Sequence, residues 1–172
     1  MAIRDIRKYP DPVLRIKTEP VKAFDAALQR LIDDMLETMY AAPGVGLAAN
    51  QVGVSLQLAV IDVSGREEKG PRRAPVVLIN PEILSREGTV VAEEGCLSIP
   101  DYAENVKRAT KVKVRAQDRS GKAFEVEADG LFAKALQHEI DHLNGILFVD
   151  RLSPLKKSIF RRRLKKALAE TA

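Results

Sequence analysis

The sequence predicts one domain in which α-helices and β-strands are combined. Apolar residues recur at helical spacing over 25–40. Apolar and charged residues alternate over 111–116 and again over 124–128, on either side of a polar turn, which is the pattern of a β-hairpin. A second helix is predicted over 130–144, and a basic amphipathic helix over 153–172. The 172 residues, 45% of them hydrophobic, can bury a sizeable core, and no linker or internal repeat divides them.

The first part of the chain is expected to form an arm, a helix and a loop. Three prolines over 9–20 predict an extended arm with turns. Asp25 is the expected N-cap of the first helix. The apolar face of that helix is formed by Leu28, Leu31, Ile32, Met35, Leu36 and Met39. The small, glycine-rich stretch 44–53 predicts a loop whose backbone closely approaches another group.

The middle of the chain is expected to be mainly strands. Strands are predicted over 56–63, 76–79 and 88–92. The polar stretch 64–75 predicts a surface loop. In the hairpin that follows, one strand has a basic outer row and the other an acidic one, so we expect ion pairs across the two strands.

The two C-terminal helices have recognisable ends. Asp129 is the expected N-cap of the helix over 130–144, and Gly145 marks its end. Ser153 and Pro154 occupy the N-cap and first position of the last helix.

Positive charge is concentrated in that last helix. The net charge is +4, but residues 151–172 carry eight Lys or Arg and one Glu, whereas the first 150 residues carry 20 basic and 23 acidic side chains. Its apolar residues form only a narrow stripe, which argues against binding flat on a membrane. The helix is either docked on the domain with a solvated charged face, or it contacts nucleic acid.

The single cysteine excludes an intramolecular disulfide and fits a reducing compartment. The N-terminus has no apolar signal region, and no stretch reaches about 18 apolar residues. We therefore expect a cytoplasmic protein with neither a membrane nor DNA as its partner.

Both histidines of the chain lie within five residues, 138–142, which read HEIDH. On a helix, positions i and i+4 share a face, so His138 and His142 can hold one metal ion. Glu139 follows the first histidine, as the general base does in helical metal sites of this kind. A catalytic site of this kind needs a third protein ligand and an open position.

The third ligand must be Cys, Asp or Glu. Phe148 stands where an extended motif would place another histidine, and the carboxylates beyond the helix are Asp150 and Glu170. Cys96 is the better candidate, since a thiolate suits zinc or ferrous iron. The alternative is that Cys96 is a small buried apolar side chain.

Three segments resemble the signature motifs of peptide deformylases in sequence, order and spacing: 44–51 (GVGLAANQ), 94–98 (EGCLS) and 137–142 (QHEIDH). With 9–15 (YPDPVLR), which is similar to the family's N-terminal arm, the resemblance covers residues 3 to 155. It implies an α+β fold with mixed, largely antiparallel strands around a central helix that carries both histidines. It also implies a hydrolase of protein biosynthesis that removes the formyl group from formyl-methionine of nascent polypeptides and releases formate.

The resemblance implies a role for each site residue. The metal ligands would be Cys96, His138 and His142, with Fe²⁺ as the native metal and Zn²⁺, Ni²⁺ or Co²⁺ able to replace it. Glu139 would transfer protons, and the Gln51 amide and Leu97 backbone N–H would stabilise an oxyanion. The methionine pocket would be lined by Val45, Leu131 and Ala135, with backbone from Gly44, Gly46 and Glu94. The alternatives are bracing of the loop for Gln51 and core packing for Leu131.

Two positions depart from the common family pattern. Many relatives carry arginine where this chain has Ala103, and an apolar residue where it has Lys134, which leaves the peptide preference open. Some relatives are understood to contact ribosomal RNA, so the basic helix is a candidate ribosome contact. Two other functions compete: a peptidase with a His or Glu third ligand, and a small RNA-binding protein with a structural metal.

Overall fold

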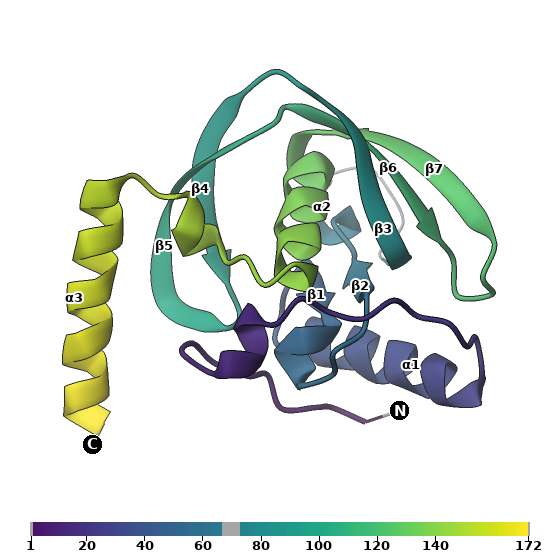
Figure 1. The fold of residues 1–172 in the computed structure, drawn as a ribbon, viewed down its shortest axis with the longest axis horizontal. Coiled ribbons are helices and arrows are strands. Elements are labelled where there is room, and N and C mark those ends of the chain that lie inside the picture. Colours follow the sequence, from purple (N-terminus) through teal and green to yellow (C-terminus); the bar gives the residue numbers. More distant parts are fainter. Residues whose placement is uncertain (1, 67–72, 172) are drawn as a thin grey trace.

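The computed structural model describes residues 2–66 and 73–171, and within them the chain forms helices and antiparallel strands, which confirms the α+β prediction (Figure 1). The helices are α1 (Ala26–Ala41), α2 (Gly130–Leu143) and α3 (Pro154–Thr171). The strands are β1 (Gly46–Ala48), β2 (Leu58–Ile61), β3 (Val76–Glu87), β4 (Val90–Cys96), β5 (Ile99–Arg108), β6 (Lys111–Gln117) and β7 (Ala123–Asp129).

The strands form two sheets on either side of α2. One sheet has five strands in the order β1-β2-β3-β6-β7, and the other is the β4–β5 ribbon. Every pairing of these strands is antiparallel. Figure 1 shows α2 near the centre, between the β4–β5 ribbon and the β3, β6 and β7 strands. Both histidines lie on this helix, so the topology encloses them between the two sheets.

The first helix forms as predicted. The Asp25 carboxylate accepts a hydrogen bond from the backbone N–H of Leu28 at 2.9 Å, which satisfies a donor that the helix itself leaves free. The apolar face of α1 packs in one buried cluster with Leu47 of β1 and Leu58 of β2. Burial of this face anchors the short strand that precedes the Gln51 turn.

The second helix is buried on nearly all sides. Leu136 and Ile140 pack into a cluster with β6 and β7 residues. Asp129 occupies the N-cap position, but its side chain makes no capping hydrogen bond. At the other end Gly145 has φ +75°, and a Cβ there would lie 2.8 Å from the carbonyl carbon of Arg15. Glycine therefore lets the helix end pass close to the N-terminal arm.

The hairpin is also as predicted. Strands β6 and β7 pair directly, and Glu125 forms ion pairs with Arg115 at 3.4 Å and with Lys113 at 3.8 Å. The two charged rows therefore face each other across the strands.

Three stretches differ from the sequence prediction. The expected loop over 44–53 contains β1 and a 3₁₀ turn, η2 (Ala49–Val52). Strand β3 continues well beyond 79, and β5 is not indicated by the sequence pattern, because Pro100, Asp101 and Asn105 disfavour strands. The expected surface loop over 64–75 lies partly in residues 67–72, which are outside the described residues.

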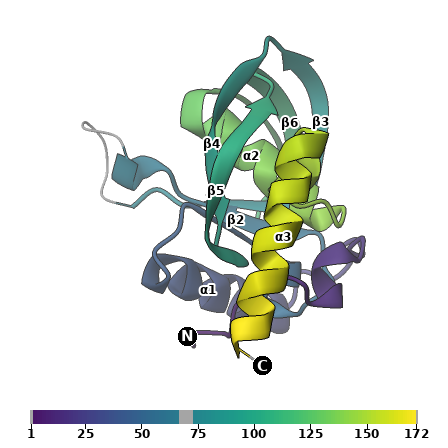
Figure 2. The same cartoon turned by 90° about the vertical axis from the view of Figure 1, so that its left-hand side faces the viewer.

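The last helix docks beside β5 (Figure 2). Ser153 caps it by accepting the Lys156 N–H at 3.3 Å, with Pro154 as its first residue. Phe160 is 5% exposed and packs in a cluster with Leu14 and Val106. Among the described residues, no helix has the length and hydropathy that crossing a bilayer requires.

Candidate metal centre

Three side chains meet beside α2 in a group that could hold a metal ion. The Cys96 Sγ and one ring nitrogen each from His138 and His142 all lie within 4.8 Å of one another. The Nε2 atoms of the two histidines are 3.0 Å apart, and Cys96 Sγ is 3.3 Å from Nε2 of His142. The helical spacing brings the rings together, and the end of β4 supplies the sulfur.

The two separations of 3.0 and 3.3 Å lie at or slightly below those between the ligands of a tetrahedral ion. Ligands bonded at about 2.0–2.3 Å in that geometry lie about 3.3–3.6 Å from each other. Two imidazole nitrogens and one thiolate form a donor set that suits zinc or ferrous iron, with one position left for another ligand. The residues present therefore fit a divalent metal.

Glu94 fixes the orientation of His138. Its carboxylate lies 2.9 Å from Nδ1 of His138, so that nitrogen donates and the Nε2 lone pair is directed at the other two ligands. Arg108 donates twice to the same carboxylate, at 2.8 and 2.9 Å. Burial alone would raise the pKa of Glu94, but hydrogen bonds from Arg108 and His138 hold it at about 2. Glu94 therefore stays ionised.

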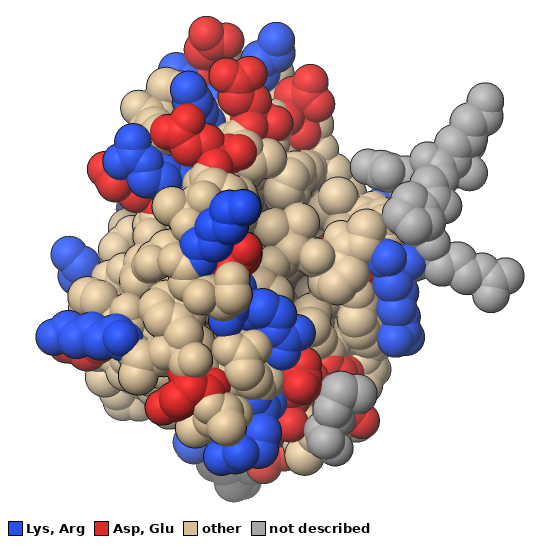
Figure 3. Space-filling view, turned by 90° about the vertical axis from the view of Figure 1, so that its right-hand side faces the viewer, with Lys and Arg blue, Asp and Glu red and all other residues tan. Residues whose placement is uncertain are grey.

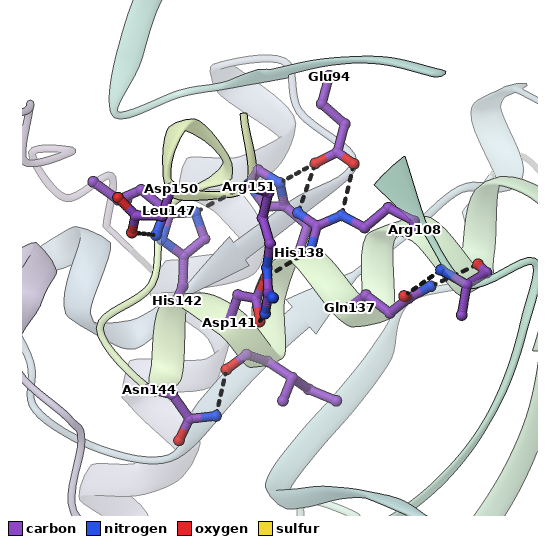
Figure 4. A network of polar contacts seen from close by, with 12 residues as sticks. Glu94, Arg108, Gln137, His138, Asp141, His142, Asn144, Leu147, Asp150 and Arg151 are labelled. Carbon is purple, nitrogen blue, oxygen red and sulfur yellow. Dashed lines mark hydrogen bonds and ion pairs between the residues drawn. The ribbon is translucent and has the colours of Figure 1, made fainter. Parts of the chain in front are cut away.

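The charged network continues along the helix to the segment that follows it (Figure 4). Arg108, which is 5% exposed, donates to Asp141 at 2.6 Å. Arg151 donates to the same carboxylate at 2.8 and 3.1 Å. Gln137 accepts from the backbone N–H of Ala109 at 2.9 Å and donates to its carbonyl at 3.0 Å. These contacts fix α2 against β5 and against the residues after the helix.

The pKa values of the two histidines are shifted in opposite directions. Burial opposes a charge on His138, but hydrogen bonding to Cys96 and the nearby charge of Glu139 raise its pKa well above the ordinary value. Burial, and then the charge on His138, lowers the pKa of His142 well below it. Since their nitrogens nearly touch, the two rings cannot both be charged, and a bound cation would take the place of a proton.

Glu139 is a buried acid beside the ligands. It is 4% exposed, and among the described residues its Oε1 has no hydrogen-bond partner. Burial raises its pKa to about 7, so it can gain or lose a proton near neutral pH. Its carboxylate lies against Gly46, where a Cβ would come within 2.8 Å of the Glu139 Cδ. Glycine at this position therefore makes room for the acid.

Gln51 and Leu97 lie next to the sulfur. The Gln51 amide nitrogen donates to Ser98 Oγ at 3.0 Å and lies 3.6 Å from Cys96 Sγ, while its oxygen accepts from Ala48 N–H at 2.9 Å. The side chain of Leu97 closely approaches Gly44, where a Cβ would lie 2.8 Å from its Cδ1. Contacts of this kind bring the first two motifs together.

The N-terminal segment contacts the first two motifs and the end of α2, just beyond the third. Arg7 N–H donates to the Gln51 carbonyl at 2.6 Å, and Tyr9 N–H donates to the Ser98 carbonyl at 2.8 Å. Thr18 donates to the Leu143 carbonyl at the end of α2 through both its N–H and its hydroxyl, at 2.9 and 2.8 Å. The arm thus holds together segments that are far apart in sequence.

The group lies at a cleft of about 580 Å³. Every residue that the sequence placed at the site lines this cleft except His142, which is 1% exposed beneath it. Those lining residues are Gly44, Val45, Gly46, Gln51, Glu94, Cys96, Leu97, Leu131, Ala135, His138 and Glu139. Leu131 is 38% exposed at the cleft, so core packing does not account for it. Ala103 and Lys134 also line the cleft.

The sequence of most of the chain matches one family. A model of the polypeptide deformylase family matches residues 3–158. The chain belongs to the polypeptide deformylase family. Peptide deformylases are metal-dependent hydrolases that remove the N-formyl group from nascent polypeptides.

Individual relatives agree over nearly their full length. A peptide deformylase from Syntrophobacter fumaroxidans is 55% identical over 170 residues, which are 99% of this chain and 98% of the relative. The crystal structure of a Legionella pneumophila peptide deformylase has a TM-score of 0.88 and 53% identity, covering 99% and 98% of the two chains. That of a Synechococcus elongatus peptide deformylase in complex with actinonin has a TM-score of 0.83 and 45% identity, covering 89% and 83%.

The position of the extended motif and the nearer downstream carboxylate both make other contacts. Phe148 stacks near the His138 ring, with centroids 6.2 Å apart and planes inclined by 24°. Asp150 accepts from Leu147 N–H at 2.9 Å and forms an ion pair with Arg15. Phe148 therefore packs against the ligand His138, and it does so from the position where the extended motif would place a third histidine.

Several residues that shape the centre were not indicated by the sequence. Arg108, Asp141, Arg151 and Ser98 hold the ligands or Gln51 in place through the contacts above. Asp141 could have been suspected, because a carboxylate within a buried helix requires a partner. Arg108 lies in an unpredicted strand, and nothing in its local sequence marks it. Glu94 was expected to contribute backbone, but the structure also engages its carboxylate with His138.

Proposed function

We propose that this chain hydrolyses the formyl amide of N-terminal formyl-methionine with Fe²⁺ held by Cys96, His138 and His142, and that Zn²⁺, Ni²⁺ or Co²⁺ can replace the iron. The observation that carries the proposal is the meeting of those three donor atoms at a cleft, next to the buried carboxyl group of Glu139. A divalent ion in such a site lowers the pKa of water to about 7 and so supplies hydroxide at neutral pH.

Glu139 is proposed to move the protons of the reaction. It accepts the proton of the attacking water and delivers it to the amine that leaves when the formyl C–N bond breaks. Its pKa, raised to about 7 by burial, permits both steps near neutral pH. The contact with Gly46 keeps the carboxylate beside the metal ligands.

The Gln51 amide and the Leu97 N–H are proposed to stabilise the oxyanion that forms on the formyl oxygen. The amide nitrogen of Gln51 lies 3.6 Å from Cys96 Sγ, and therefore next to the reacting centre. A single donor of this kind contributes about 10²–10³ in rate. We expect Gln51→Leu to lower kcat by that factor with the metal content unchanged, and equal loss of both would indicate a structural role.

The methionine side chain is proposed to enter the apolar part of the cleft. Val45, Leu131 and Ala135 line it, and Gly44, Gly46 and Glu94 border the same space. Methionine is unbranched and flexible, so it fills an irregular apolar pocket well. Ala103 and Lys134 also line the cleft and leave the preference for the following residue open.

Formate release from formyl-Met-Ala-Ser tests the proposal directly. The protein should be purified without oxygen, because a thiolate ligand and ferrous iron both oxidise, and its metal content should be measured in parallel. Glu139→Gln keeps the size of the side chain and is expected to retain metal but lose turnover. Retained turnover in this variant would refute the role of Glu139.

Cys96→Ser separates this function from a peptidase. A peptidase with a His or Glu third ligand would keep its metal after this change, whereas a deformylase centre is expected to lose it or hold it weakly. The closed four-ligand site of a structural metal is not favoured, because the donor set leaves one position open and the group lies at a cleft.

The basic helix α3 is proposed to contact ribosomal RNA. Its exposed cations are Arg161, Arg162, Arg163, Lys165 and Lys166. On the face seen in Figure 3, by contrast, basic and acidic side chains are interspersed wherever they are drawn in colour. Phe160 keeps the helix docked, so its exposed charges can be changed without detaching it.

Ribosome co-sedimentation tests this contact. Arg161→Glu combined with Arg162→Glu should weaken binding, and binding of the unchanged chain should fall steeply with salt. The matched control is Lys111→Glu on β6, away from α3. Co-sedimentation that neither the α3 charge reversal nor deletion of 154–172 reduces would refute the contact.

We also propose that residues 1–172 form one catalytic domain and that the protein acts in the cytoplasm. Nascent formyl-methionine chains are made there, and its single cysteine would remain reduced. Limited proteolysis should then release no stable half of the chain.

A further inference from the structure

The strand β5 has two neighbours with different roles. Its first five residues, 99–103, line the peptide cleft. The strand also lies beside α3, as Figures 1 and 2 both show. The C-terminal helix therefore contacts a wall of the cleft, although its own residues do not line it.

Tyr102 is the residue through which the two are connected. It lines the cleft, and its ring centroid lies 4.8 Å from that of Phe160 on α3. The Arg163 guanidinium lies 5.8 Å from the centre of the same ring. Phe148 also stacks on Tyr102, with centroids 6.2 Å apart.

A second contact fixes α3 to the same strand two residues further on. Lys156 forms an ion pair with Glu104 at 3.1 Å. Phe160 itself is 5% exposed, and Tyr9 of the N-terminal arm contacts its ring edge-on at 5.5 Å. The helix is thus held on β5 by a buried aromatic ring and an ion pair, both adjacent to the cleft.

We propose that α3 holds Tyr102 in the wall of the peptide cleft, so that docking of this helix sets the affinity for the formyl peptide. Phe160 is a positioning residue in this scheme, because it acts only through Tyr102. A ring that is fixed before the peptide arrives does not have to be ordered when the peptide binds, which strengthens binding. The inference rests on the proposed function, since it concerns the same cleft.

Steady-state kinetics of formate release from formyl-Met-Ala-Ser test the coupling. Phe160→Ala is expected to raise KM by about threefold to tenfold, the range that loss of one aromatic contact produces, with kcat within about twofold. Tyr102→Ala should raise KM similarly, and the double variant should add little more. Tyr102→Phe and Phe160→Tyr keep the ring contact and should restore the original KM.

Leu155→Ala is the matched control, because Leu155 lies on α3 but is 68% exposed. It should leave KM unchanged. The coupling is refuted if Phe160→Ala leaves KM unchanged, or if KM, kcat and metal content all deteriorate together, which would indicate general loosening. If the unchanged protein released no formate, the proposed function would fail, and this inference with it. An active protein with an insensitive KM would refute the coupling alone.

Discussion

One added methyl group tests where the buried acid Glu139 is held. A Cβ at Gly46 would lie 2.8 Å from the Glu139 Cδ, well inside ordinary contact distance. Glu139 is 4% exposed and has little room to move aside. Overpacking of this kind lowers the free energy of unfolding by about 1–3 kcal/mol. For a chain of this length each kcal/mol lowers Tm by about 2–4 °C, so Gly46→Ala should lower Tm by about 2–12 °C.

The same variant should lose most of its turnover, although its Tm falls only moderately. If the methyl group displaces the Glu139 carboxylate by about 1 Å, turnover should fall by about 10²-fold, because proton transfer depends on that placement. Gly65→Ala is the control, since no atom lies within 4 Å of a Cβ at Gly65. Thermal unfolding and formate release would be measured on both variants at equal metal content. If Gly46→Ala kept both Tm and kcat, the packing argument would be refuted.

Three further changes test the buried charges and the metal. Arg108→Met removes the cation that the buried carboxylates of Glu94 and Asp141 share, and should lower the free energy of unfolding by about 3–5 kcal/mol in urea, whereas Arg115→Met on the exposed hairpin should lower it by less than about 1 kcal/mol; equal losses would contradict the network. Burial alone would raise the pKa of Asp62, but hydrogen bonds from Ser64 and Tyr40 hold it below its ordinary value. A carboxylate whose pKa is lowered by folding stabilises the fold at pH values above its unfolded-state pKa, and this stabilisation is lost as the pH falls. The loss of unfolding free energy caused by Asp62→Asn should therefore shrink between about pH 7 and pH 3; a constant loss would contradict this. Chelation should lower Tm and added Zn²⁺ should restore it, because an ion that binds only the folded state stabilises it; an unchanged Tm would count against the metal centre.

Local patterns predicted much of the fold, because their information lies within a few residues. The Asp25 cap and the apolar spacing that follows define α1, and alternation defines the β6–β7 hairpin. The metal group could also be anticipated: two histidines one helical turn apart need a third donor, and Cys96 was the suitable candidate left. The structure brings these three together.

Features that depend on distant partners could not be predicted in this way. Strand β5 contains Pro100 and Asp101 and is stabilised by pairing with β4, which no local pattern reveals. Arg108 looks like any surface arginine in sequence, yet it is buried between Glu94 and Asp141. The glycine-rich stretch was expected to be a loop, but its pairing with β2 makes part of it a strand.

The N-terminal arm has a consequence for the timing of assembly. Lys8 contacts Leu97, which lies 89 positions further along the chain, and Thr18 contacts Leu143, 125 positions further along. Closing such long loops is slow, and the segment that is synthesised first must wait for partners that are synthesised much later. A newly made copy of this protein is therefore expected to stay inactive until most of its own chain has left the ribosome.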